Sequence, residues 1–169
     1  MFPIELRLSN NKDRCEQIIR ESAELLAVPE RAILSVVVAE DNNEDYGASI
    51  EECRGFNGSS THSSGGAGKT VPFRNKDGTI QSEIVYPSTT LTALFIYSKE
   101  SPTYLLSRYA ILHEFGHAID FNARSVVFPS VLLENESTIA EYANYYGTII
   151  LSELAACFIS GAYISKTAL

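Results

Sequence analysis

The segment His113-Glu114-Phe115-Gly116-His117 places two of the chain's three histidines four residues apart. On an α-helix, residues at i and i+4 share one face, with their Cβ atoms about 5–6 Å apart. Two imidazole nitrogens on that face can converge on one Zn²⁺ at about 2.0–2.1 Å. Glu114 lies beside them, as in the His-Glu-x-x-His pattern, where the glutamate takes a proton from a water. The motif therefore predicts a helix that carries two metal ligands and a base.

The flanking residues favour a helix that is largely buried. Ser101-Pro102 is a suitable helix start, and no further proline or glycine occurs before Gly116. Apolar residues recur at helical spacing, at positions 105, 106, 109, 112, 116 and 119. The competing interpretation is a core helix whose histidines are only hydrogen-bonded. The histidine pair, with the glutamate in place, favours the metal site.

Length and composition indicate one globular domain over residues 1–169, with 45% apolar and 20% charged residues. A net charge of −8 argues against nucleic acid or an anionic membrane as a partner, because either needs a basic face. The odd number of cysteines predicts reduced thiols at Cys15, Cys53 and Cys157. No signal peptide is visible, so we expect a cytoplasmic protein or one exported by another route. The oligomeric state stays open.

The hydrophobic pattern predicts an α+β fold with helices against one small sheet. The expected elements are a helix over 10–27, a strand over 32–39, a hairpin of strands 70–73 and 79–86, a strand over 91–98, the motif helix, and a long helix over about 137–164. The Gly/Ser-rich residues 57–69 predict a flexible loop, and a lid, a substrate-binding edge or a linker all fit that composition. Gly68-Lys69-Thr70 echoes the end of a phosphate-binding loop, but position 63 lacks the required glycine, which excludes that site.

A catalytic zinc ion usually has three protein ligands, and no histidine follows His117. The third ligand is therefore expected among the downstream carboxylates Glu134, Glu136, Glu141 and Glu153. Residues 148–164 are nearly all apolar and predict a buried helix rather than a membrane span. Glu153 lies in that helix, and a carboxylate enclosed by Leu154, Phe158 and their neighbours is costly unless it is paired or metal-bound. Glu153 is favoured for this reason, and Glu141 is the main alternative.

Two further residues are candidates for roles beside the metal. Tyr146 lies seven residues, or about two helical turns, before Glu153, so both would lie on nearly the same face. Its phenol would either donate to the oxyanion of a tetrahedral intermediate or pack in the core. Asp120 follows His117 by three residues, and it either orients that histidine or is a surface charge.

Residues 105–160 resemble the lethal-factor-like zinc metalloproteases, which include the catalytic domain of anthrax lethal factor and the clostridial Pro-Pro endopeptidases. The family pattern is His-Glu-Phe-Gly-His-Ala-x-Asp, then a tyrosine, a zinc-binding glutamate seven positions later, and an alanine three further on. Residues 113–120, Tyr146, Glu153 and Ala156 fit those places, while Cys157 stands where an acidic residue is common. The resemblance implies a zincin-like fold, with zinc ligands His113, His117 and Glu153, Glu114 as general base and Tyr146 as oxyanion donor.

The sequence thus predicts a zinc-dependent endopeptidase that hydrolyses a protein or peptide substrate. Glu114 would take a proton from the attacking water and pass it to the leaving amine, and Tyr146 would stabilise the oxyanion. A second resemblance, to the ImmA-like peptidases that cleave repressors, depends on Ala143-Asn144 and points to Glu141 as the ligand. A zinc-binding or interaction module without turnover is the remaining alternative, and the intact Glu114 argues against it.

Overall fold

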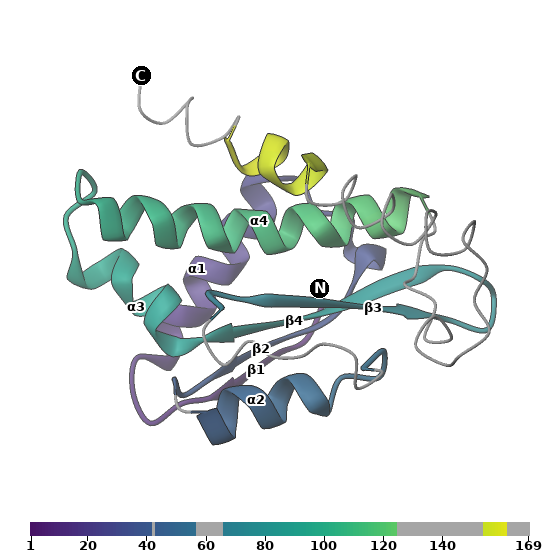
Figure 1. Ribbon diagram of the computed structural model, residues 1–169, viewed down its shortest axis with the longest axis horizontal. Coiled ribbons are helices and arrows are strands. Elements are labelled where there is room, and N and C mark those ends of the chain that lie inside the picture. Colours follow the sequence, from purple (N-terminus) through teal and green to yellow (C-terminus); the bar gives the residue numbers. More distant parts are fainter. Residues whose placement is uncertain (42, 57–65, 125–153, 162–169) are drawn as a thin grey trace, which may run out of the picture.

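The computed structural model describes residues 1–41, 43–56, 66–124 and 154–161, which form a mixed α+β fold (Figure 1). In chain order the elements are β1 (Ile4–Arg7), α1 (Lys12–Leu25), the 3₁₀ turn η1 (Glu30–Ala32), β2 (Ile33–Ala39), α2 (Asn43–Glu51), β3 (Lys69–Arg74), β4 (Ile80–Pro87), α3 (Ser88–Ile96) and α4 (Pro102–Arg124). Residues 154–161 are also helical and are yellow in Figure 1. The predicted α+β class and small sheet are confirmed.

The described strands form one sheet in the order β1-β2-β4-β3. Strands β1, β2 and β4 are parallel, whereas β3 runs antiparallel to β4. The predicted hairpin is correct: Gly78 has a φ of +86°, and the Thr79 backbone N–H donates to the Asp77 carboxylate at 3.0 Å. Glycine adopts this backbone conformation without the steric penalty that a side chain would impose.

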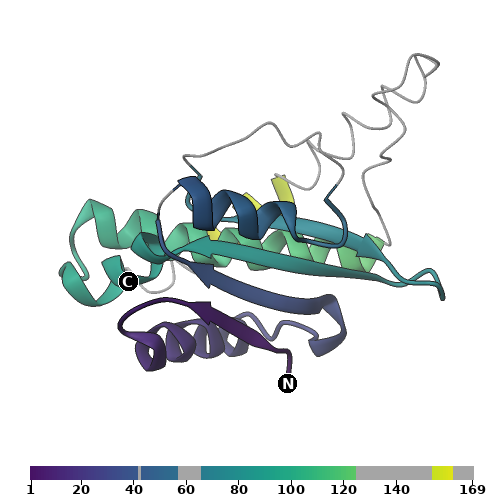
Figure 2. The ribbon, with the colours of Figure 1, turned by 90° about the horizontal axis from the view of Figure 1, so that it is seen from below.

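Helices cover both faces of the sheet. Helices α1, α3 and α4 lie against one face, and α2 lies against the other (Figures 1 and 2). Successive side chains of β2 point to opposite faces of the sheet. Val36 and Val38 point into the larger core beneath α1 and α4, while Val37 contacts α2. A strand buried on both faces is expected to be apolar throughout, which explains the sequence of β2.

The predicted strand over 91–98 is wrong, since this segment belongs to α3. Its apolar residues enter the core at helical spacing: Leu91 is buried, and Leu94 and Phe95 are packed against the same cluster. A short apolar run fits a buried strand and a buried helix equally well. Pro87 ends β4 in an extended conformation, and the burial of Leu91, Leu94 and Phe95 on one helical face is the physical reason for the helix that follows.

Two elements were not predicted. Helix α2 lies in a polar segment, yet Tyr46, Ile50 and Cys53 are buried at spacings of four and three residues, the signature of one helical face. Strand β1 has only four residues, of which Ile4 and Leu6 face the larger core while Glu5 and Arg7 alternate with them.

Helix α4 begins at Pro102, as predicted, and the Ser101 hydroxyl accepts from the Tyr104 backbone N–H at 3.1 Å. The prediction that the whole helix is largely buried is wrong for its first turns, where Leu105 and Leu106 are 39% and 69% exposed. The fully buried stripe begins later, with Ile111, Leu112, Phe115, Ala118 and Phe121. The second half of α4 therefore provides the packing surface, because the core beneath it is completed only there.

Among the helices that the structure describes, none combines the length and apolar character that a bilayer crossing requires.

Candidate metal centre

The two motif histidines converge in the second half of α4. Their Nε2 atoms lie 3.1 Å apart, and their rings meet edge-on with centroids 4.7 Å apart. Two nitrogens at 2.0–2.1 Å from one tetrahedral zinc ion would be separated by about 3.3 Å. His117 is buried and His113 is half-buried, so the pair opens to solvent on one side. As it stands, the contact between the Nε2 atoms is a hydrogen bond between the two imidazoles, and the same spacing would let both nitrogens bind one metal ion.

Aromatic neighbours one turn away fix the two imidazoles. The Tyr109 ring lies 5.5 Å from the His113 ring, measured between centroids. The Phe121 ring is stacked on the His117 ring at 5.7 Å, with an angle of 15° between the planes. Residues 109, 113, 117 and 121 thus form one row along the helix at four-residue spacing. The row restricts the ring orientations that bring the Nε2 atoms together.

Phe115 and Gly116 determine how α4 packs against its neighbours. Phe115 is fully buried, and its ring contacts those of Phe2 and Tyr86 at 6.3 Å and 6.4 Å. Gly116 faces the segment 154–161, where a Cβ on the glycine would come within 2.9 Å of the Ala156 Cα. Only glycine permits this approach, so Gly116 lets the second helix lie directly on α4.

Glu114 points towards strand β3. The Thr70 hydroxyl donates to the Glu114 Oε2 at 2.6 Å and lies 3.0 Å from the Glu114 carbonyl oxygen. Burial raises the pKa of Tyr46 and of Tyr86 well above the usual value, and the charge of Glu114 raises each further. Both phenols therefore stay protonated at neutral pH, and Tyr86 donates to the Ile111 carbonyl at 2.8 Å.

Cys157 lies beside the other nitrogen of His113. Its Sγ is 3.9 Å from the Nδ1, on the opposite side of the ring from the Nε2 that faces His117. All three cysteines are free, as predicted, with Cys15 and Cys53 buried and Cys157 exposed. Burial raises the pKa of the Cys53 thiol to about 12. In the sequence, Cys157 differs from the family pattern, but nothing in the sequence predicts that it lies close to His113.

The structure thus brings the His113 and His117 side chains together, while Glu114 of the same helix is bonded to Thr70. Tyr146, Glu153 and the other carboxylate candidates (Glu134, Glu136 and Glu141) lie outside the described residues, and so does the loop over 57–65. Asp120 is half-buried, and its role stays a prediction. Within the described ranges, no three histidine, cysteine or carboxylate side chains are grouped to hold a metal ion. A complete zinc site requires a ligand from elsewhere in the chain.

The predicted enclosure of Glu153 by Leu154 and Phe158 is wrong. Leu154 and Phe158 were expected to enclose that carboxylate, but they are 61% and 77% exposed. The buried face of this helix carries the small residues Ala156 and Ser160 instead. An apolar sequence indicated burial, but helix 154–161 approaches α4 through small side chains and leaves Leu154 and Phe158 exposed, while Ile159 packs partly against the core.

No protein-family model matches this chain, and no curated protein or solved structure matches it either. The inference of function therefore depends on the chemistry and geometry of the site.

Proposed function

We propose that this protein is a zincin-like, zinc-dependent endopeptidase that holds its metal through His113, His117 and Glu153. The observation that carries the proposal is the 3.1 Å approach of the two Nε2 atoms. It is reinforced by Glu114, which follows His113 on the same helical turn. Zinc bound there would act as a Lewis acid that activates a water and polarises the scissile carbonyl.

The chain's own groups supply the proton transfers. Glu114 accepts the proton of the attacking water and returns it to the leaving amine. Tyr146 donates to the oxyanion that develops on the carbonyl. The aromatic row that contains Tyr109 and Phe121 holds the histidines in place, so little reorganisation accompanies metal binding.

The contacts of helix 154–161 support Glu153 as the third ligand over Glu141. Leu154, the next residue after Glu153, is the first described residue of this segment and is already helical. Ala156 packs on Gly116, and the Cys157 Sγ lies beside His113. The described neighbours of Glu153 therefore reach the histidine pair.

The metal prediction is tested by elemental analysis of zinc in identically purified wild type, Glu141→Ala and Glu153→Ala. We expect about one zinc ion per chain in the wild type and in Glu141→Ala, and loss from Glu153→Ala, because a three-ligand site fails without one ligand. Loss only from Glu141→Ala would move the ligand and favour the ImmA-like alternative. A wild type without zinc, even after zinc is offered, would refute the proposal.

The reaction is tested with Glu114→Gln on a peptide library. The variant should retain zinc and lose activity by about 10²–10⁴-fold, the usual contribution of a general base. Glu24→Gln, an exposed carboxylate on α1, is the matched control and should be fully active. Full activity in a folded, zinc-loaded Glu114→Gln would contradict the mechanism. Zinc binding without turnover in the wild type would favour a binding module instead.

A further inference from the structure

Thr70 connects Glu114 to the sheet. It is the second residue of β3, pairs with Ile84 in β4, and its side chain is buried. Its hydroxyl has one proton, and the 2.6 Å distance to the Glu114 Oε2 is typical of donation to a charged carboxylate. A strand paired along its length is a rigid support, so the donor is fixed in position before any substrate arrives.

Gly68 contacts the stem of the same glutamate. A Cβ on Gly68 would lie 2.7 Å from the Glu114 Cγ and 3.0 Å from the Tyr86 Cδ1, so no other residue fits without displacing them. The backbone at this point is anchored from α3, where the Thr90 hydroxyl donates to the Ala67 carbonyl at 2.8 Å. Residues 67–70 thus contact Glu114 at both its stem and its carboxylate.

We propose that Thr70 is a positioning residue for the general base, acting with Gly68 to hold the Glu114 carboxylate beside the histidine pair. The inference rests on the proposed function and deepens it. A glutamate has several rotatable bonds, and proton transfer needs the carboxylate within hydrogen-bond reach of its partner. Since the histidines belong to α4 itself, Thr70 acts on turnover and not on zinc binding.

The test compares Thr70→Val, which has nearly the same shape but no hydroxyl, with Thr70→Ser, which keeps the donor. We expect kcat to fall about 10–100-fold in Thr70→Val, since misplacing a reacting group by about 1 Å costs up to this much. The KM and the zinc content should stay at wild-type values, and Thr70→Ser should recover most of kcat. An unchanged kcat in Thr70→Val, an equal loss in Thr70→Ser, or a loss that follows zinc content would overturn the proposal.

A second measurement does not depend on catalysis. Urea unfolding of the full chain without metal is followed for wild type, Thr70→Val, Glu114→Ala and the double variant. If the hydroxyl holds the carboxylate, the shift of the midpoint in the double variant is smaller than the sum of the single shifts. Additive shifts would refute the contact. A chain that shows coupling but binds no zinc would leave the Thr70–Glu114 contact intact and refute the proposed function alone.

Discussion

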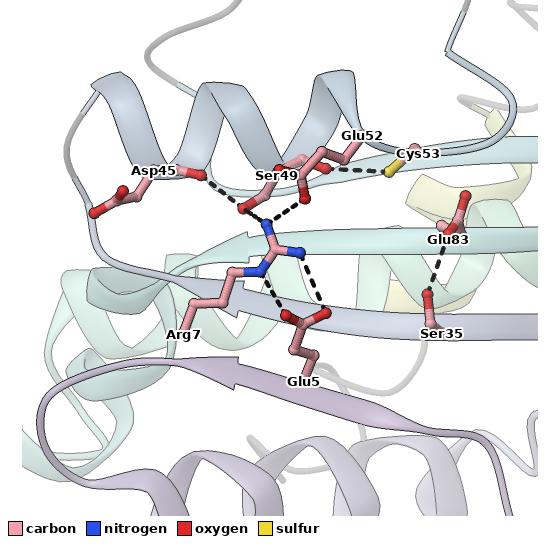
Figure 3. A network of polar contacts seen from close by, with 8 residues as sticks. All are labelled: Glu5, Arg7, Ser35, Asp45, Ser49, Glu52, Cys53 and Glu83. Carbon is pink, nitrogen blue, oxygen red and sulfur yellow. Dashed lines mark hydrogen bonds and ion pairs between the residues drawn. The ribbon is translucent and has the colours of Figure 1, made fainter.

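The two faces of the sheet use polar side chains in opposite ways. On the face covered by α2, a cluster of charged groups around Arg7 joins the helix to β1 (Figure 3). On the face covered by α4, the neutral hydroxyl of Thr70 donates to the carboxylate of Glu114, which belongs to the same helix as the two histidines. The first arrangement is rich in charge and partly exposed, and the second has few polar atoms beside a large apolar core.

The Arg7 cluster pairs opposite charges. Its guanidinium donates from Nε and Nη2 to the Glu5 carboxylate at 2.8 Å and 3.2 Å. Its Nη1 donates to the Ser49 hydroxyl at 2.9 Å and lies 2.6 Å from the Glu52 Oε2 (Figure 3). These contacts raise the pKa of Arg7, and the hydrogen bond from Arg7 lowers the pKa of Glu5. The Glu5 carboxylate is thereby held in the charged form and becomes a poorer proton acceptor.

The Arg7 cluster and the Thr70–Glu114 contact differ in whether the carboxylate has a cationic partner, so a dense charged network does not by itself indicate a catalytic site. A cationic partner stabilises a carboxylate but removes much of its affinity for a proton. A neutral donor such as the Thr70 hydroxyl orients the Glu114 carboxylate without placing an opposite charge beside it. The proposed function assigns the acid–base chemistry to the face with fewer charges.

The largest loss of stability is expected from a substitution in the apolar core beneath α4. Phe115→Ala should lower the free energy of unfolding by about 3–5 kcal/mol, because it leaves a cavity among fully buried side chains. Phe115→Leu, which retains much of the volume, should lose clearly less. Urea unfolding measures both, and a loss in Phe115→Ala no larger than that of an Arg7 variant would break the comparison.

A smaller effect is expected from the charged side. Arg7→Met should cost about 1 kcal/mol or less, because the Arg7 side chain is 32% exposed and its carboxylate partners remain solvated when it is lost. The loss should shrink in high salt, and the zinc content should not change. Arg31→Met, at an exposed arginine of η1, is the control and should be near neutral. A salt-independent loss would show that Arg7 acts through packing instead.

The smallest expected effect is the pH-dependent contribution of Glu5 to stability. Since the folded-state pKa of Glu5 lies below the ordinary 4.5, its contribution is fully present above about pH 4.5 and is lost as the pH falls through the lowered pKa. Glu5→Gln should therefore be less stable than wild type near neutral pH, by under about 1 kcal/mol for this exposed pair. The difference should diminish in acid. Unfolding midpoints from pH 3 to 7 measure it, and a gap that widens in acid would contradict the assignment.

Periodicity in the sequence was enough to predict α1, β2, the β3–β4 hairpin and the start of α4. It failed for α3, where Thr89, Thr90 and Thr92 are β-branched and favour a strand, while tertiary packing of Leu91 selects a helix. It also missed β1, although the alternation of Ile4 and Leu6 with charged residues was visible. Local pattern is informative only where the burial of a segment follows from that segment alone.

The candidate site divides in the same way. The histidine pair and Glu114 are local in sequence and could be predicted from the motif. Thr70 and Gly68 could not, because their roles come from the docking of β3 beside α4. In the sequence, Gly68-Lys69-Thr70 resembles only the end of a phosphate-binding loop, and the pattern does not point to Glu114. The exposure of Leu154 could not be predicted either. Helix 154–161 buries Ala156 and Ser160, whereas a large apolar residue such as Leu154 would ordinarily be expected inside.

The contact between Thr70 and Glu114 spans 44 residues of chain, whereas the two histidines are separated by four. A helical turn forms within about a microsecond, but the strand can meet the helix only after a long loop has closed. We therefore expect the histidine pair to be aligned early in folding and the contact between Thr70 and Glu114 to form later. On the proposed function, a partly folded chain that retains α4 would keep its histidines aligned before the Glu114 carboxylate is held by Thr70, so zinc binding would come before hydrolytic activity.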